Sequence, residues 1–291
     1  MKNALMYYYK LENPTIYKNN GKTYVKDEMN RYMLEVVHSI KELNEIYYLT
    51  SKLKVKNYNQ IVITKFNELF FEHNATKYVL IKTINTTPHH ESEIIKKEKI
   101  VNNNYLLDRS NWYFLWCKKN DYFEYQNSHI TRKYKFIDES TDYYIGMAET
   151  AISYLKYNIN STNDYLTICH KRIKPEEMNN PMNLILDHRE RDISEYLKYL
   201  FIKKQNNLES INRILNFYTY TKNEYIRIYA RMLYPSYYFD IYEKVVNENE
   251  KERKLREILN RIDEYEKYLY QIYILISKKE KIKKVDWINE K

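Results

Sequence analysis

The stretch that decides the fold runs from Tyr165 to Asp192 and reads YLTICHKRIKPEEMNNPMNLILDHRERD. An apolar, β-branched run ends in His170, and a second apolar run, NLILD, ends in Asp187. Short apolar runs of this kind, bounded by polar segments, predict strands. Helical patterns precede and follow the stretch along the chain. We therefore expect a strand–loop–strand unit that interrupts a helical region.

The residues before position 85 predict a small module that is rich in strands. Aromatic and β-branched residues flank Asn20-Gly21, a pair that favours a two-residue hairpin turn because both residues tolerate positive φ. Apolar residues between Met29 and Tyr47 recur at helical spacing and predict one long helix. Residues 59–85 then predict two or three further strands. The order of these elements predicts an α+β module over residues 1–84.

The polar segment around Pro88 predicts a linker at residues 85–93. The remaining residues, 94–291, predict a mainly helical lobe that contains the hairpin and ends in one long helix from Glu248 to Lys278. The expected architecture is thus α+β, with a small β-rich N-terminal lobe and a larger helical C-terminal lobe.

The composition excludes several classes of protein. Only two of the 291 residues are glycine, so a glycine-rich phosphate loop is nearly excluded. The chain is basic, with a formal net charge of +9, but its 48 basic and 39 acidic residues are interspersed, which does not favour nucleic acid as the partner. An A/T-rich genome would also favour lysine codons, so part of the lysine content needs no functional explanation.

The cysteine content and the apolar runs bear on the compartment. Two distant cysteines, Cys117 and Cys169, form no metal or disulfide pattern and fit a reducing compartment. No segment has the length of a signal peptide or of the ~18 apolar residues of a membrane helix. The sequence therefore predicts a cytoplasmic protein without a membrane span.

The two-lobe plan is typical of protein-kinase-like phosphotransferases, and His170 ends an apolar strand where their catalytic loop begins. Such enzymes need an acidic base two residues later, but this chain has Arg172, and a guanidinium cannot accept a proton. The metal-binding Asn five residues beyond becomes Glu177, and Asp187 stands near the second metal-binding position.

For the lysine that steadies the nucleotide phosphates, the candidate is Lys26, paired with Glu35 or Glu28 on the following helix. Each residue also has a purely structural interpretation. His170 fits a buried, hydrogen-bonded histidine, Asp187 fits a turn cap, and Lys26 fits a solvated lysine. Their order and spacing, rather than any single residue, support the catalytic interpretation.

Several segments resemble the spore-coat kinase-like proteins of endospore-forming bacteria, the CotS/YutH group, which are related to aminoglycoside and choline phosphotransferases. These segments are ICHKRI, NPMNLILDHRERDISEYLK, LWCKKNDYFE, YYIGMAETAISYL and ARMLYPSYYFD. The resemblance implies an aminoglycoside-phosphotransferase-like fold and an association with the spore coat. By position, it implies that His170 is the catalytic-loop histidine, that Arg172 replaces the base, that Asp187 binds metal and that Asp192 braces the loop.

These observations lead to one main hypothesis and two alternatives. The main hypothesis is a catalytically degenerate phosphotransferase, a pseudokinase, that acts as a binding or scaffold module with protein partners in spore coat assembly. It would work in the mother-cell cytoplasm or the coat, with no cofactor certain and with ATP and Mg²⁺ as the possible ones. The first alternative is an active small-molecule kinase that uses ATP and Mg²⁺ with Glu177 or another acid as base. The second is a basic nucleic-acid-binding protein.

Overall fold

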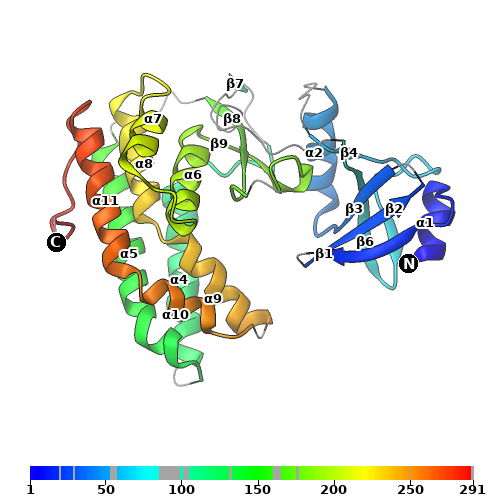
Figure 1. The fold of residues 1–291 in the computed structure, drawn as a ribbon, viewed down its shortest axis with the longest axis horizontal. Coiled ribbons are helices and arrows are strands. Elements are labelled where there is room, and N and C mark those ends of the chain that lie inside the picture. The colour runs from blue at the N-terminus through cyan, green and yellow to red at the C-terminus, as the bar shows by residue number, and fades with distance from the viewer. Residues whose placement is uncertain are drawn as a thin grey trace. The chain divides into compact units, whose positions relative to one another are not determined.

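The computed structural model describes residues 1–19, 21–28, 30–52, 58–84, 99–100, 105–130, 133–159, 165–174, 177–248 and 250–289. The chain divides into two compact units. Unit 1 comprises Met1–Asp108 and Thr167–Asp187, and unit 2 comprises Arg109–Leu166 and His188–Lys291. Strands gather in unit 1, whereas the described part of unit 2 is built mainly from helices (Figure 1).

The main sheet of unit 1 is antiparallel and has the strand order β1-β2-β3-β6-β4, with β5 paired to β6. Its strands are β1 (Thr15–Asn19), β2 (Lys22–Asp27), β3 (Asn30–Val36), β4 (Gln60–Ile61), β5 (Phe71–His73) and β6 (Thr76–Lys82). Asn19 pairs with Lys22, which confirms the predicted two-residue hairpin, and Gly21 has a φ of 77°. The prediction of two or three strands in residues 59–85 is also confirmed.

The predicted helix from Met29 to Tyr47 is wrong in its first half, because β3 occupies that part and α2 (Ile40–Lys52) begins only afterwards. Consecutive residues of β3 are buried: Tyr32, Met33 and Leu34. A strand that is buried on both faces gives a continuous apolar run, which imitates helical spacing when a helix follows. The helix starts at a cap, since the Glu42 backbone N–H donates to Ser39 Oγ at 3.2 Å.

A short helix, α1 (Lys2–Tyr9), precedes the first strand, and it was not predicted from the sequence. It ends at Lys10, which adopts a left-handed conformation and donates its N–H to Met6 O. Leu5 is fully buried and packs in a small core with Val25 and Leu80 of the sheet. Burial of this one side chain against the sheet, rather than helix propensity, explains the position of α1.

The predicted strand–loop–strand unit is confirmed as part of a three-stranded sheet with the order β7-β8-β9. These strands are β7 (Lys99–Ile100), β8 (Leu166–His170) and β9 (Leu184–Asp187). The sequence suggested that this hairpin belongs with residues 94–291, but contacts group Thr167–Asp187 with unit 1. The predicted linker, residues 85–93, lies outside the described residues.

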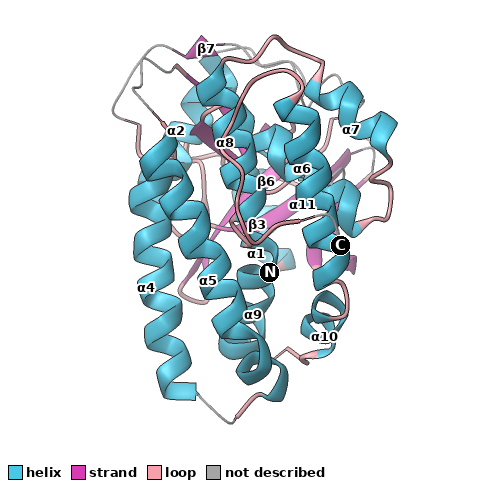
Figure 2. Ribbon diagram, turned by 90° about the vertical axis from the view of Figure 1, so that its left-hand side faces the viewer, coloured by secondary structure: helices cyan, strands magenta, loops and turns pink. Residues whose placement is uncertain are grey.

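Unit 2 is a helical assembly in which α8 packs against α5, α6 and α11 (Figures 1 and 2). Its helices are α4 (Trp112–Ile130), α5 (Lys135–Asn158), α6 (Glu190–Ile202), α7 (Leu208–Leu215), α8 (Lys222–Leu233), α9 (Ser236–Glu248), α10 (Arg253–Leu259) and α11 (Ile262–Ser277). Among the described residues, none of these helices combines the length and the apolar character needed to cross a bilayer.

The predicted final helix, Glu248 to Lys278, is wrong as a single element because the chain breaks between α10 and α11 at Asn260 and Arg261. The Arg261 guanidinium donates to the carbonyl oxygen of Phe201 at 3.0 Å and lies 4.1 Å from the centre of its ring. This contact with α6 accompanies the change of direction between the two helices.

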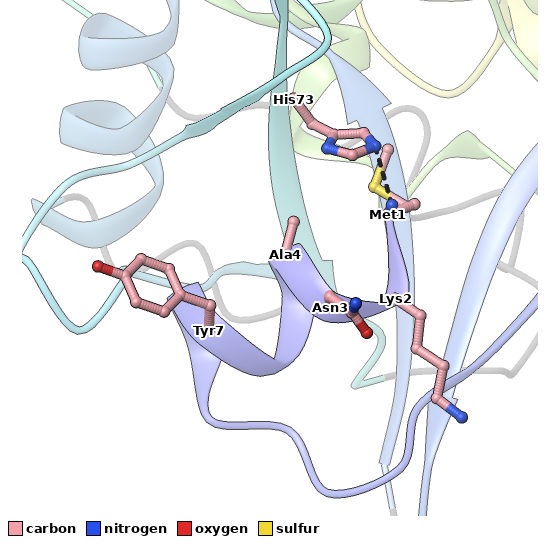
Figure 3. Close-up of a pocket in the computed structure, with 6 residues that line it drawn as sticks. All are labelled: Met1, Lys2, Asn3, Ala4, Tyr7 and His73. Carbon is pink, nitrogen blue, oxygen red and sulfur yellow. Dashed lines mark hydrogen bonds between the residues drawn. The ribbon is translucent and has the colours of Figure 1, made fainter.

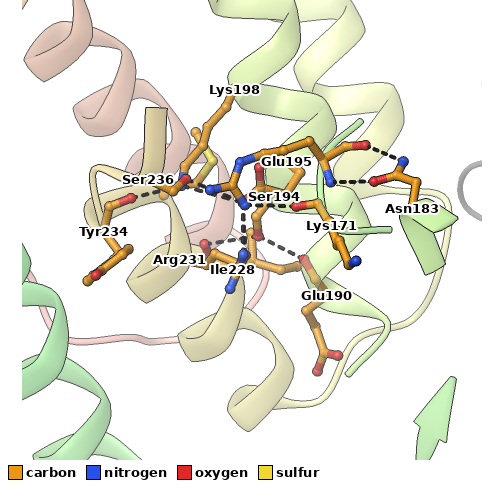
Figure 4. Close-up of polar contacts among 12 residues, drawn as sticks. Lys171, Asn183, Glu190, Ser194, Glu195, Lys198, Ile228, Arg231, Tyr234 and Ser236 are labelled. Carbon is orange, nitrogen blue, oxygen red and sulfur yellow. Dashed lines mark hydrogen bonds and ion pairs between the residues drawn. The ribbon is translucent and has the colours of Figure 1, made fainter. Parts of the chain in front are cut away.

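Buried ion pairs join α6 to α8 in unit 2. Arg227 Nη2 lies 2.9 Å from Glu190 Oε1, and Arg231 Nη2 lies 2.9 Å from Glu195 Oε1. Figure 4 shows the second pair beside Lys198, which donates to Tyr234 O and Ser236 Oγ. Burial raises the pKa of Glu190 to about 7, against the opposing attraction of Arg227.

Candidate functional site

His170 is the last residue of β8 and is buried. Its Nε2 lies 3.0 Å from the hydroxyl oxygen of Tyr58, and the two rings stack with centroids 6.0 Å apart. A buried imidazole with a tyrosine partner on one nitrogen has a fixed ring orientation. Sequence reasoning missed Tyr58, because no pattern links a residue before β4 to the hairpin.

The side chain of Asn183 fixes the backbone of Arg172, the residue that the sequence predicts at the position of the catalytic base. Arg172 N–H donates to Asn183 Oδ1 at 3.3 Å, and Asn183 Nδ2 donates to Arg172 O at 3.0 Å. The Arg172 guanidinium also donates to Lys171 O at 2.7 Å. Asn183 thus joins the start of the connecting loop to its end. The residue at this position is a fixed cation rather than a proton acceptor.

The loop between β8 and β9 packs on the main sheet of unit 1. Glu177 Oε1 lies 3.5 Å from Lys22 Nζ on β2 and 3.6 Å from Lys174 Nζ. Asn180 Nδ2 donates to Glu35 Oε1 on β3 at 3.1 Å. Asn59 N–H donates to Asn179 O at 2.9 Å. These contacts explain why the hairpin is grouped with unit 1.

The lysine beside Glu35 is Lys22 and not the predicted Lys26. Lys22 Nζ lies 3.6 Å from Glu35 Oε1 as well as 3.5 Å from Glu177. Lys26 is exposed on β2, opposite Thr15 and Arg31 in the sheet. We call the group of Lys22, Glu35, Glu177 and Asn180 the Lys22 cluster. Lys22 follows the hairpin turn directly and begins β2, but this position did not identify it as the partner of Glu35.

Glu35 and Glu28 do not lie on a helix as predicted. Glu35 is on strand β3, and Glu28 is in the turn between β2 and β3. In kinases the third strand supplies the phosphate-steadying lysine and the following helix supplies its glutamate. Here β3 reads NRYMLEV and contains no lysine. Lys22 and Glu35 lie instead on the neighbouring strands β2 and β3.

A glutamate of α2 has a different role, which the sequence did not reveal. Glu45 lies on α2, and its two carboxylate oxygens accept hydrogen bonds from the backbone N–H groups of Leu106 and Leu107, at 2.9 and 2.7 Å. Leu107 O in turn accepts the N–H of Leu186 on β9. Glu45 thus holds the backbone that runs beside the hairpin.

Asp187, the predicted metal ligand, is the fully buried last residue of β9. It pairs with Thr167, whereas His170 pairs with Leu184. This register separates His170 from Asp187 by three residue steps, about 10 Å along the strands. Glu177 is in the loop at the opposite end of the hairpin. Among the described residues, no group of three or more acidic, histidine or cysteine side chains could hold a metal ion.

Asp192 lies in the first turn of α6 in unit 2 and is fully buried. A carboxylate in this position interacts favourably with the exposed N–H groups and the dipole at the helix start. The position of Asp192 at the start of α6 therefore explains its negative charge without a role in catalysis.

An open depression in unit 1 is lined by Met1, Lys2, Asn3, Ala4, Tyr7 and His73 (Figure 3). The Met1 amino nitrogen lies 2.8 Å from His73 Nε2 across it. None of the predicted site residues lines this depression, so the hairpin and the Lys22 cluster remain the candidate site.

Comparison with known proteins gives consistent results. A sequence model of the family described as "Spore coat putative kinase YutH" matches residues 2–272. The Endospore coat-associated protein YutH of Bacillus subtilis (strain 168) is 27% identical over 272 residues, covering 78% of each chain.

Solved structures resemble the chain in fold. An aminoglycoside phosphotransferase from Alicyclobacillus acidocaldarius matches with a TM-score of 0.59 and 11% identity, covering 94% of this chain and 95% of that one. The AMP-bound spectinomycin phosphotransferase APH(9)-Ia matches with a TM-score of 0.58 and 13% identity, covering 96% and 98%. These similarities confirm the predicted aminoglycoside-phosphotransferase-like fold.

Proposed function

Because the chain belongs to the spore coat YutH family, we propose that it is a catalytically degenerate phosphotransferase that acts as a binding or scaffold module in spore coat assembly. The B. subtilis relative is described as endospore coat-associated, which supports a role at the coat. A location in the mother-cell cytoplasm is part of the proposal. Protein partners in that assembly are part of the proposal. The fold alone does not imply phosphate transfer, since function depends on the site.

The observation that carries the proposal is the Lys22 cluster. A kinase needs a lysine whose ammonium group meets the nucleotide phosphates. Here Lys22 faces two carboxylates, those of Glu35 and Glu177, at 3.6 and 3.5 Å. Active kinases also pair this lysine with one glutamate, so the distinguishing feature here is the second carboxylate, that of Glu177, which would repel an incoming phosphate. The cluster therefore fits an internal ion pair better than it fits ATP.

The residue at the base position supports the same conclusion. Arg172 cannot accept the proton of an attacking hydroxyl, and Asn183 fixes its backbone on both sides. Glu177, the acid that could replace the base, is engaged by Lys22 and Lys174. These contacts argue against the alternative of an active kinase with an altered base.

The predicted metal ligands support it as well. Asp187 ends β9 at one end of the hairpin, and Glu177 lies in the loop at the other end. Mg²⁺ in phosphotransferases bridges phosphate oxygens while it is held by clustered oxygen ligands. The two acids named by the sequence do not form such a cluster in the described residues.

A direct test of the degenerate site is ADP release by the purified chain. The protein is incubated with ATP and Mg²⁺ or Mn²⁺ and with small alcohols, aminoglycosides or spectinomycin as acceptors. We expect ADP at the level of a reaction without protein. ADP release that disappears in Asp187→Ala, with the unfolding temperature retained, would contradict the proposal and favour an active kinase.

The scaffold role needs a test in spores. A fluorescent fusion of the chain is expressed during sporulation, beside a Lys22→Met variant and an exposed-surface control, Lys26→Met. We expect both variants to reach the coat as the wild type does, because assembly does not depend on phosphate transfer. Loss of coat localisation in Lys22→Met alone, at equal protein level, would contradict a scaffold role that is independent of the site.

A further inference from the structure

The outer face of α4 carries an exposed aromatic stripe. Phe114, Tyr122 and Tyr125 are 50%, 41% and 66% exposed, and Lys118 is exposed between them. The spacing of these residues places them on one face of a helix. The opposite face is buried in unit 2 through Trp112, Trp116, Asn120 and Phe123. Figure 2 shows α4 beside α5 within the helical part of the chain.

Such a stripe needs a physical reason, because exposed aromatic side chains in a contiguous row are typical of protein interfaces. Within the described chain, Lys118 Nζ lies 4.4 Å from the centre of the Phe114 ring and covers part of it. Tyr125 contacts the ring of His129, with centroids 4.3 Å apart. These contacts order the stripe but leave its outer surface open to solvent.

The order of residues along the stripe is self-complementary. Phe114 and Tyr125 lie at equal distances on either side of the point between residues 119 and 120, and so do Lys118 and Asp121. Two copies of α4 that pack antiparallel about a two-fold axis at this point would place each residue opposite its counterpart. Phe114 would face Tyr125 and Lys118 would face Asp121, while Tyr122 would face the partly buried Cys117.

We propose that the α4 stripe, formed by Phe114, Lys118, Asp121, Tyr122 and Tyr125, docks against the same stripe of a second copy of this chain. The interface is isologous, so one two-fold axis generates each contact twice. A helix of 19 residues is about 28 Å long, and a single helix pair buries less than a standard stable interface. We therefore expect a weak dimer, which is in equilibrium with the monomer and forms as the protein concentration rises.

Sedimentation equilibrium of the full chain over a wide range of concentrations tests the proposal. We expect wild-type mass to rise from monomer toward dimer, and Phe114→Asp and Tyr125→Asp to stay monomeric. The matched control is Leu208→Asp on α7, since Leu208 is 55% exposed on the same unit. A monomer at every concentration, or a dimer that Phe114→Asp leaves unchanged, overturns the proposal. If the chain is a monomer at every concentration, the α4 stripe would instead be a binding surface for a different protein.

A charge exchange tests the antiparallel register. Lys118→Glu places two acids opposite each other, and Asp121→Lys places two lysines opposite each other, so each variant alone should dimerise about tenfold more weakly. An equimolar mixture of the two restores both opposite-charge contacts and should recover the wild-type affinity. Equal unfolding temperatures establish that all variants fold. A mixture no tighter than the single variants contradicts this register.

Discussion

Unit 2 and unit 1 use glutamates and basic side chains in contrasting ways. In unit 2, Arg227 and Arg231 of α8 each meet a glutamate of α6 at 2.9 Å, and these side chains are at most 5% exposed. In the Lys22 cluster of unit 1, Lys22 lies between two glutamates at 3.5 and 3.6 Å, and the three side chains are 20–27% exposed.

The difference in burial between the two groups of ion pairs determines how much each contributes to stability. A buried pair cannot lose one partner without leaving an uncompensated charge away from water, so the α6–α8 pairs hold the helical unit together. A partly exposed cluster contributes little to stability, because water solvates each charge when its partner is removed. In the function that we propose, the Lys22 cluster matters for a different reason, because it sets the charges that a phosphate would meet. A site of this kind can lose its catalytic chemistry while the fold persists.

The largest expected effect comes from breaking a buried pair. Arg227→Met leaves Glu190 buried without its cation and should lower the free energy of unfolding by about 3–5 kcal/mol at about pH 8. Urea denaturation measures the change. The double variant Glu190→Leu/Arg227→Met should recover most of the loss, since the uncompensated charge is gone. A single variant as stable as the wild type would mean that the pair contributes nothing.

A smaller effect follows from pH. The pKa of Glu190 is raised to about 7 by burial, so between about pH 4.5 and 7 the folded chain binds more protons at this group than the unfolded chain does. Stability from this group is therefore fully present below about pH 4.5 and is lost as pH rises toward 7, by at most about 3 kcal/mol. Thermal unfolding of wild type and Glu190→Gln at several pH values should differ in this direction. If the unfolding temperatures of the wild type and of Glu190→Gln changed in parallel with pH, Glu190 would not be the group responsible for this pH dependence.

The smallest effect is expected in unit 1. Lys22→Met removes the shared lysine of a partly exposed cluster and should change the free energy of unfolding by about 1 kcal/mol or less. Lys26→Met, on the exposed part of the same strand, is the matched control and should change it even less. Urea denaturation compares the two. A loss as large as that of Arg227→Met would remove the contrast between the units.

Much of the fold could be predicted from the sequence, because its signals are local. The Asn20-Gly21 turn, the strands of residues 59–85 and the hairpin at Leu166–Asp187 follow from residue types over short windows. The failure at β3 has a physical cause, since a strand buried on both faces lacks alternation. The serine and glutamate at Ser39 and Glu42 were the signal that the helix starts later.

The site was less predictable. His170, Arg172 and Asp187 were found in one hairpin, as their order in the sequence indicated. The sequence did not predict that Lys22 is the partner of Glu35. Lys22 and Glu177 are far apart in the sequence and meet only when the loop packs on the sheet. No local pattern distinguishes Lys22 from Lys26, which share a strand and a spacing that places both on one face.

In the proposed function, Lys22 occupies the lysine site of this fold, and Glu35 and Glu177 of the same chain fill that site. Calorimetric titration of the full chain with ATP and Mg²⁺ tests it most directly, with Lys22→Met and Lys26→Met as paired variants. We expect no Mg²⁺-dependent binding of ATP to the wild-type chain. Saturable, Mg²⁺-dependent binding that Lys22→Met abolishes and Lys26→Met retains would contradict it.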